Sequence, residues 1–131
     1  MSLTYFCPSC WSEVETGTTC PQCGADLRDF AGETYERKLI RALHHPEPTV
    51  PRRVAEILGE LGSRAAVEPL LDLVESTSDP YIQEAAVEAL GRIGDARALP
   101  CLQRLSREGA VRVRNAAKRG LRTIGAHATQ R

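Results

Sequence analysis

The 131-residue sequence has few aromatic side chains, with one Trp, three Tyr and two Phe. It has no uninterrupted apolar run of the roughly 18 residues that a membrane-spanning helix needs. Residues 1–6 lack the charged and apolar segments of a secretory signal. Net charge is also absent, because 17 basic and 17 acidic residues cancel. These absences argue against a membrane partner and favour a cytoplasmic protein of one or two small domains.

Four of the five cysteines form two closely spaced pairs near the N-terminus, namely Cys7 with Cys10 and Cys20 with Cys23. In a chain without a secretory signal, paired Cys-x-x-Cys turns favour metal binding over disulfides. Two such turns that face each other provide four soft thiolates in a tetrahedral arrangement, which suits Zn²⁺ and leaves no open position for substrate. We therefore predict one structural Zn²⁺ per chain, bound by these four residues.

The segment from Cys7 to Leu27 resembles the short zinc-ribbon modules in which Cys-Pro-x-Cys-Gly occurs twice. Trp11 stands where the first Gly of that pattern is expected, so the first turn should differ slightly from the second. The segment is also similar to the iron-holding knuckles of rubredoxins, but rubredoxin domains are longer and rich in aromatics. Zinc is thus the preferred ion, iron is the alternative, and residues 1–31 are assigned to a zinc-ribbon module.

A repeat follows, because residues 54–62, 86–94 and 117–125 align at spacings of 32 and 31 residues. Each copy has apolar residues on one helix face. The predicted buried stripes are Val50, Val54, Leu58 and Leu61, then Ile82, Ala86, Leu90 and Ile93, then Val113, Ala117, Leu121 and Ile124. Gly62 and Gly94 are expected to end helices in left-handed conformation, and Ser63, Asp79 and Asp95 to cap the next ones.

These patterns predict an all-α fold for residues 32–131, with six helices near residues 33–44, 50–61, 64–76, 80–93, 96–107 and 111–124. The alternation of helices with their own apolar stripes is typical of an α-solenoid. The zinc module is expected to cover the exposed end of the first helix, since terminal repeats need a cap.

The residues Ala-x-x-Ala-Leu-Gly-x-Ile-Gly-Asp-x-x-Ala at positions 86–98 resemble the short HEAT repeats of the phycobilisome-lyase type. The resemblance extends from about Leu39 to Gly125. Such repeats occur in bilin lyases and in many more scaffolding proteins, so the resemblance implies an armadillo-like solenoid more strongly than any chemistry.

The sequence contains no phosphate-binding loop or nucleophile elbow. The adjacent His44 and His45 and the isolated Cys101 are interpreted as structural residues. We therefore predict that the chain is not an enzyme, but a non-enzymatic scaffold module that binds a protein partner, with a monomer favoured. A bilin-lyase-like enzyme or chaperone is the less favoured alternative.

The charges are unevenly distributed along the chain. Residues 33–91 contain six basic and eleven acidic side chains, whereas residues 92–131 contain ten basic and two acidic ones. This asymmetry predicts a partner-binding surface for an acidic protein, made by Arg114, Lys118, Arg119 and Arg122. Nucleic acid is the alternative partner, bound without sequence specificity because no aromatic residue follows Tyr81.

Overall fold

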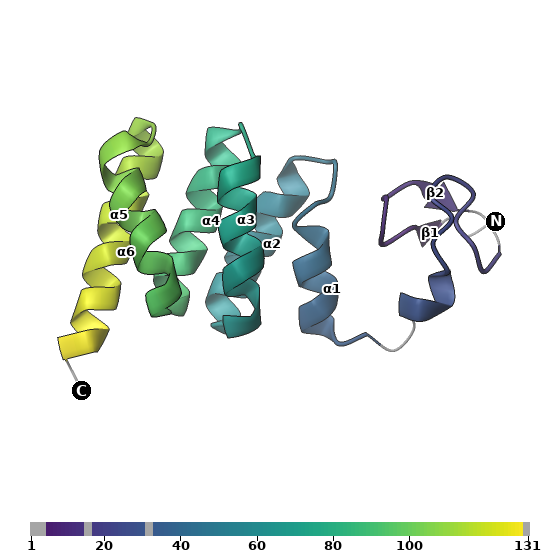
Figure 1. The fold of residues 1–131 in the computed structure, drawn as a ribbon, viewed down its shortest axis with the longest axis horizontal. Coiled ribbons are helices and arrows are strands. Elements are labelled where there is room, and N and C mark those ends of the chain that lie inside the picture. The colour runs from purple at the N-terminus through teal and green to yellow at the C-terminus, as the bar shows by residue number, and fades with distance from the viewer. Residues whose placement is uncertain (1–4, 15–16, 31–32, 130–131) are drawn as a thin grey trace.

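A computed structural model describes residues 5–14, 17–30 and 33–129, and Figure 1 shows its fold. The described α-helices are α1 (Tyr35–Ala42), α2 (Thr49–Leu61), α3 (Val67–Ser76), α4 (Pro80–Ile93), α5 (Leu99–Glu108) and α6 (Val111–Thr129). All six predicted helices are therefore confirmed. The starts of α3 and α5 lie three residues later than predicted, because Arg64–Ala66 and Ala96–Ala98 form short 3-10 turns before them. Helix α6 continues past its predicted end.

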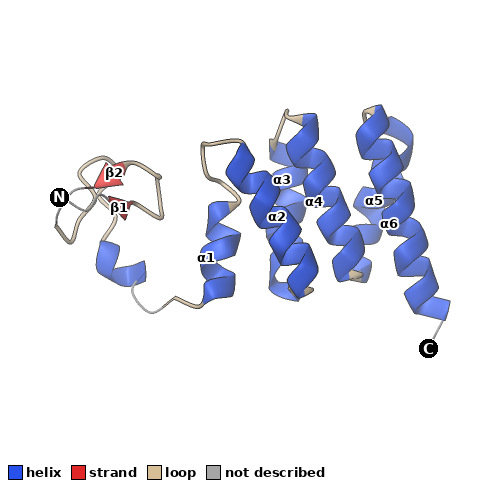
Figure 2. Cartoon of the chain, turned by 180° about the vertical axis from the view of Figure 1, so that it is seen from behind, coloured by secondary structure: helices blue, strands red, loops and turns tan. Residues whose placement is uncertain are grey.

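The six helices lie in two layers. Helices α1, α3 and α5 face the viewer in Figure 1, and α2, α4 and α6 face the viewer from the opposite side in Figure 2. This is the predicted α-solenoid. None of the described helices is both long and apolar enough to cross a bilayer.

The N-terminal segment forms a small module at one end of the row of helices (Figure 1). Strand β1 (Tyr5–Phe6) pairs antiparallel with β2 (Glu13–Val14), and a 3-10 helix occupies Leu27–Phe30. Its small buried cluster is separate from the core of the solenoid. The predicted boundary between residues 31 and 32 lies outside the described residues.

Side chains from both helical layers form one continuous core, with Leu58, Leu70 and Leu90 fully buried. The predicted stripe of α2 is wrong at its end, because Leu61 is 55% exposed. Leu58 is the last residue of that stripe to be fully buried, and Leu61 lies one turn further on at the end of the helix. Burial therefore stops before α2 does.

Most of the expected helix ends are confirmed. Gly62 and Gly94 are left-handed, with φ angles of 64° and 75°. The carboxylates of Asp79 and Asp95 accept hydrogen bonds from backbone N–H groups two residues on. Ser63 was expected to do the same, but its side chain makes no capping hydrogen bond.

Instead, the buried hydroxyl of Ser63 donates a hydrogen bond to the carboxylate of Glu36 in α1. The Ser63 hydroxyl does not cap the following turn because its hydrogen bond is made to a side chain of another helix. Ser63 therefore joins the loop after α2 to the first helix of the solenoid.

Helices α2, α4 and α6 pack with almost no side chain between them where small residues meet. A Cβ atom added to Gly59 would lie 3.0 Å from Cα of Ala89, and one added to Gly91 would lie 2.7 Å from Cα of Gly120. Real Cβ atoms do not approach backbone atoms as closely as 2.7 Å. The spacing between α4 and α6 thus requires glycine at position 91.

We expect Gly91→Ala to lower the free energy of unfolding by about 1–3 kcal/mol, because the added methyl must push α4 and α6 apart. Gly125→Ala is the matched control, since its Cβ would meet no atom within 4 Å. That variant should be neutral or up to about 1 kcal/mol more stable, because alanine favours helix. Urea denaturation followed by circular dichroism measures both, and equal effects would contradict the close-packing argument.

Candidate functional site

The two cysteine pairs lie in two backbone turns of the same design. In each, the N–H of the first cysteine donates to a carbonyl five positions later, and its carbonyl accepts from the N–H four positions later. These bonds are Cys7 N to Ser12 O (2.9 Å), Trp11 N to Cys7 O (2.7 Å), Cys20 N to Ala25 O (2.9 Å) and Gly24 N to Cys20 O (2.9 Å). The repeated geometry turns both pairs of thiols toward a common centre.

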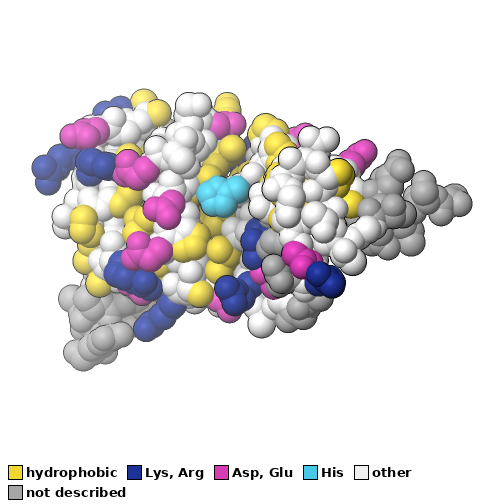
Figure 3. Space-filling model, turned by 45° about the vertical axis from the view of Figure 1, so that its right-hand side comes forward, with side chains coloured by type: hydrophobic (Ala, Val, Ile, Leu, Met, Phe, Trp, Pro, Cys, Tyr) yellow, Lys and Arg dark blue, Asp and Glu magenta, His cyan; other side chains and the backbone are white. Residues whose placement is uncertain are grey.

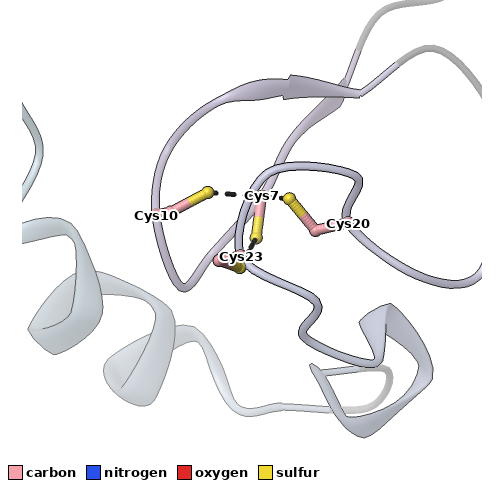
Figure 4. A group of neighbouring side chains, drawn as sticks. All are labelled: Cys7, Cys10, Cys20 and Cys23. Atoms are coloured by element: carbon pink, nitrogen blue, oxygen red, sulfur yellow. Dashed lines mark hydrogen bonds between the residues drawn. The ribbon is translucent and has the colours of Figure 1, made fainter.

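The four sulfur atoms lie within 4.8 Å of one another, and Figure 4 shows them converging from the two turns. The Sγ atoms are 3.7 Å apart between Cys7 and Cys23, and 3.6 Å apart between Cys10 and Cys20. A tetrahedral Zn²⁺ with bonds of about 2.3 Å requires sulfur atoms about 3.8 Å apart. The distances between the sulfur atoms therefore fit a bound metal ion. No other group of potential metal ligands this close together occurs among the described residues.

The thiols differ in acidity within this cluster. The hydroxyl and backbone N–H of Ser12 donate to Cys10 and lower its pKa to about 6. At Cys23 the backbone N–H of Ala25 acts in the same direction, but desolvation and the neighbouring thiols prevail and raise the pKa to about 11. A metal ion must therefore displace protons from the cluster at neutral pH, so acid should favour its release.

Trp11 adopts a left-handed backbone conformation with φ of 64°, close to the 76° of Gly24 in the second turn. The expectation that the two turns differ at this position is wrong. A left-handed conformation costs a non-glycine residue about 1–2 kcal/mol. The indole of Trp11 packs on the imidazole of His45, with ring centroids 4.7 Å apart, and Phe6 lies 6.3 Å from the same ring.

This aromatic contact connects the module to the solenoid, because His45 follows the end of α1. The Nδ1 atom of His45 accepts a hydrogen bond of 3.0 Å from the backbone N–H of Glu47, which fixes the ring. Figure 3 shows histidine where the helical layers meet the N-terminal module. The geometry gives His45 a packing role, in agreement with its interpretation as structural.

Cys101 lies apart from the cysteine cluster, half-buried on α5 against the solenoid core. Burial raises the pKa of its thiol. A thiol that stays protonated is a poor nucleophile and metal ligand, which agrees with a structural role for Cys101.

Of the four residues predicted to bind a partner, Arg119 is already paired within the protein. Lys118 and Arg122 are exposed, and Arg114 is half-buried one turn before Lys118 on the same side of α6. The exposed Arg119 donates to Glu88 of α4 at 2.9 Å. Its charge is therefore less available to a partner than those of Lys118 and Arg122.

Sequence reasoning also missed that much of the C-terminal positive charge is paired. Each pair joins an arginine to an acidic residue 28–31 positions earlier, which is one repeat: Arg97 with Glu68, Arg104 with Glu75, Arg112 with Glu84 and Arg119 with Glu88. Figure 3 shows acidic and basic side chains next to each other over the helices. The regular spacing of Glu and Arg was the available signal.

Residues 36–122 match the family of HEAT repeats, and the chain belongs to that family.

Two relatives of this chain carry the names of enzymes. Over 54 residues, 41% of this chain, the sequence is 46% identical to phycocyanobilin lyase subunit alpha of Picosynechococcus sp.. Over 99 residues, 75% of this chain, it is 29% identical to deoxyhypusine hydroxylase of Gallus gallus. The chain spans only 20% and 33% of the length of these two proteins.

A solved structure of human deoxyhypusine hydroxylase in complex with glycerol has the same fold, with a TM-score of 0.69 and 24% sequence identity. The match covers 79% of this chain and 36% of that one. The prediction of a non-enzymatic scaffold is contradicted by these relatives, which carry the names of enzymes. It failed because a search for compact catalytic motifs gives no information about a repeat fold on which enzymes are also built.

We expect purified protein to hold one metal ion per chain, measured by elemental analysis with a thiol titration. Cys20→Ser should lose the ion, because three thiolates and a hydroxyl form a much weaker site. Cys101→Ser is the control and should keep it. A metal content near zero with intact thiols in the unmodified protein would contradict the prediction.

Trp11→Gly should retain the metal, because glycine occupies the same left-handed position in the second turn. It should remove the ring-current shift that the indole imposes on the His45 imidazole, measured by proton NMR. The exposed His44 is the internal control and should not change. A His45 resonance at its random-coil position in the unmodified protein would show that the module and the helices do not pack through this contact.

Proposed function

We propose that this chain is a zinc-containing HEAT-repeat protein with an enzymatic role, and that its helical layers hold the substrate. The observation that carries this proposal is the sequence similarity to deoxyhypusine hydroxylase, which extends over 75% of the chain. Because the match is longer than the N-terminal module, most of it lies in the helices. The metal module lies at one end of the solenoid, so we assign it a role outside the surface that holds the substrate.

The four-cysteine site is assigned a structural Zn²⁺. Zinc has no redox chemistry, and four protein thiolates leave no coordination position for water or substrate. Iron in the same site is the alternative, since tetrahedral sulfur ligands also suit it. A colourless protein with bound zinc supports the assignment, whereas a red protein with iron contradicts it.

The names of the relatives suggest two reactions, and an experiment with both substrates distinguishes them. Two substrates are tested with the metal-loaded chain: a deoxyhypusine-containing protein supplied with Fe²⁺, oxygen and a reductant that converts the second oxygen atom to water, and phycocyanobilin supplied with a bilin-free phycobiliprotein. Mass spectrometry of the acceptor protein reports the addition of one oxygen atom or of the bilin. Human deoxyhypusine hydroxylase serves as the positive control for the first reaction.

We expect one of the two acceptors to be modified. The modification should survive Cys101→Ser, which leaves both the cysteine site and the exposed face of α2, α4 and α6 intact. No modification of either acceptor, in an assay where the positive control is active, would contradict an enzymatic role of these two kinds.

A protein partner is also proposed, since the solenoid presents a long surface with charges of both signs. The exposed Lys118 and Arg122 favour an acidic partner over a basic one. Binding to nucleic acid is disfavoured, because the carboxylates of Glu84 and Glu88 lie beside Arg112 and Arg119 and would repel a continuous row of phosphates.

A further inference from the structure

A depression of about 180 Å³ lies between α4 and α6, on the layer that faces the viewer in Figure 2. It is lined by Glu88, Gly91, Arg92, Ala116, Arg119, Gly120 and Thr123. The buried Gly91 and Gly120 contribute no side chain and lie in backbone contact with each other, so they form the floor of the depression. The volume is below the 300–1,000 Å³ typical of pockets for whole small molecules, and it suits one side chain.

The charges around this depression favour an anion. Arg92 and Arg119 both line it, against the single carboxylate of Glu88. Glu88 accepts one hydrogen bond from Arg119, at 2.9 Å. Arg92 is exposed and has no hydrogen-bond or ion-pair partner among the described residues. One positive charge is therefore left over, on a planar donor suited to a carboxylate.

A second cationic point lies further along the same layer, at the start of α4. The half-exposed ring of Tyr81 has the guanidinium of Arg52 at 5.4 Å and that of Arg112 at 5.0 Å from its centroid. Arg112 also donates to Glu84 at 2.8 Å, so among the described residues Arg52 supplies the unpaired positive charge there. Tyr81 and Arg92 are eleven residues apart in one helix, which corresponds to about 16 Å. An extended chain covers that distance in about five residues.

We propose that this surface docks an acidic segment of a protein, with one carboxylate in the depression beside Arg92 and Arg119 and a second beside Arg52 and Arg112. The inference rests on the substrate-holding role proposed above and names the class of segment that is held. Discrete carboxylates fit better than a nucleic acid, because Glu84 and Glu88 stand between the two cationic points. A continuous row of phosphates would be repelled there.

The test uses the full metal-loaded chain and a fluorescein-labelled Gly/Ser peptide with two Glu residues about five positions apart, the spacing set by the strand rise. Fluorescence anisotropy gives the affinity. The same peptide with Gln in place of Glu is the ligand control and should bind at least threefold more weakly. Arg92→Gln should weaken binding of the Glu peptide about three- to fivefold, the effect of one exposed charged contact.

Glu88→Gln is the more discriminating variant, because it should strengthen binding of the Glu peptide about three- to fivefold. It removes the repelling carboxylate and frees Arg119, a gain that a damaged fold would not produce. The matched control is Glu75→Gln in α3 of the opposite layer, where the carboxylate likewise pairs with an arginine one repeat later, Arg104. That variant should leave the affinity unchanged.

Lys118→Gln removes a cation from the other side of α6 and should also leave the affinity unchanged. An equal loss with Lys118→Gln and Arg92→Gln, or no gain with Glu88→Gln, would overturn the proposal. Displacement of the peptide by duplex DNA at equal phosphate and carboxylate concentration would overturn it in favour of nucleic acid. The proposed function fails separately: peptide binding with the expected pattern but no acceptor modification refutes the enzymatic role alone.

Discussion

The close approach of α4 and α6 at Gly91 and Gly120 is the constraint on which the solenoid depends. The backbones of the two helices are in contact there, so the contact fixes the distance between α4 and α6. That separation brings Arg119 to Glu88 and leaves the depression above the two glycines. Each exposed ion pair contributes at most about 1 kcal/mol, so the pairs follow from the packing and do not create it.

The N-terminal module depends on a different kind of interaction. Its buried cluster is centred on Cys7, Val14 and Cys20, too few apolar groups to pay for the ordering of its chain. Metal coordination can supply on the order of 10 kcal/mol to modules of this size. The backbone strain at Trp11 is offset by packing of its indole on His45, which follows α1.

The relation to enzymes changes how the solenoid is understood. A HEAT repeat buries one face of each helix and leaves the other free, so the same core supports scaffolds and catalysts alike. The apolar pattern therefore has no bearing on whether the free face carries chemistry. In this chain the free face of α2, α4 and α6 presents charges in alternation, and this arrangement is a property of the surface that the core pattern does not specify.

The sequence alone determined the number, order and approximate limits of the helices, because helix periodicity and caps such as Gly94 and Asp95 depend on residues within a few positions of each other. It also predicted that the four thiols meet, because two closely spaced Cys-x-x-Cys pairs are typical of one metal site. Only the tertiary structure decided that Ser63 bonds to Glu36, that Arg119 turns toward α4 and that Trp11 contacts His45. These partners are 27 to 34 residues apart in the chain, and their contact depends on how whole helices and turns are placed, which no local pattern encodes.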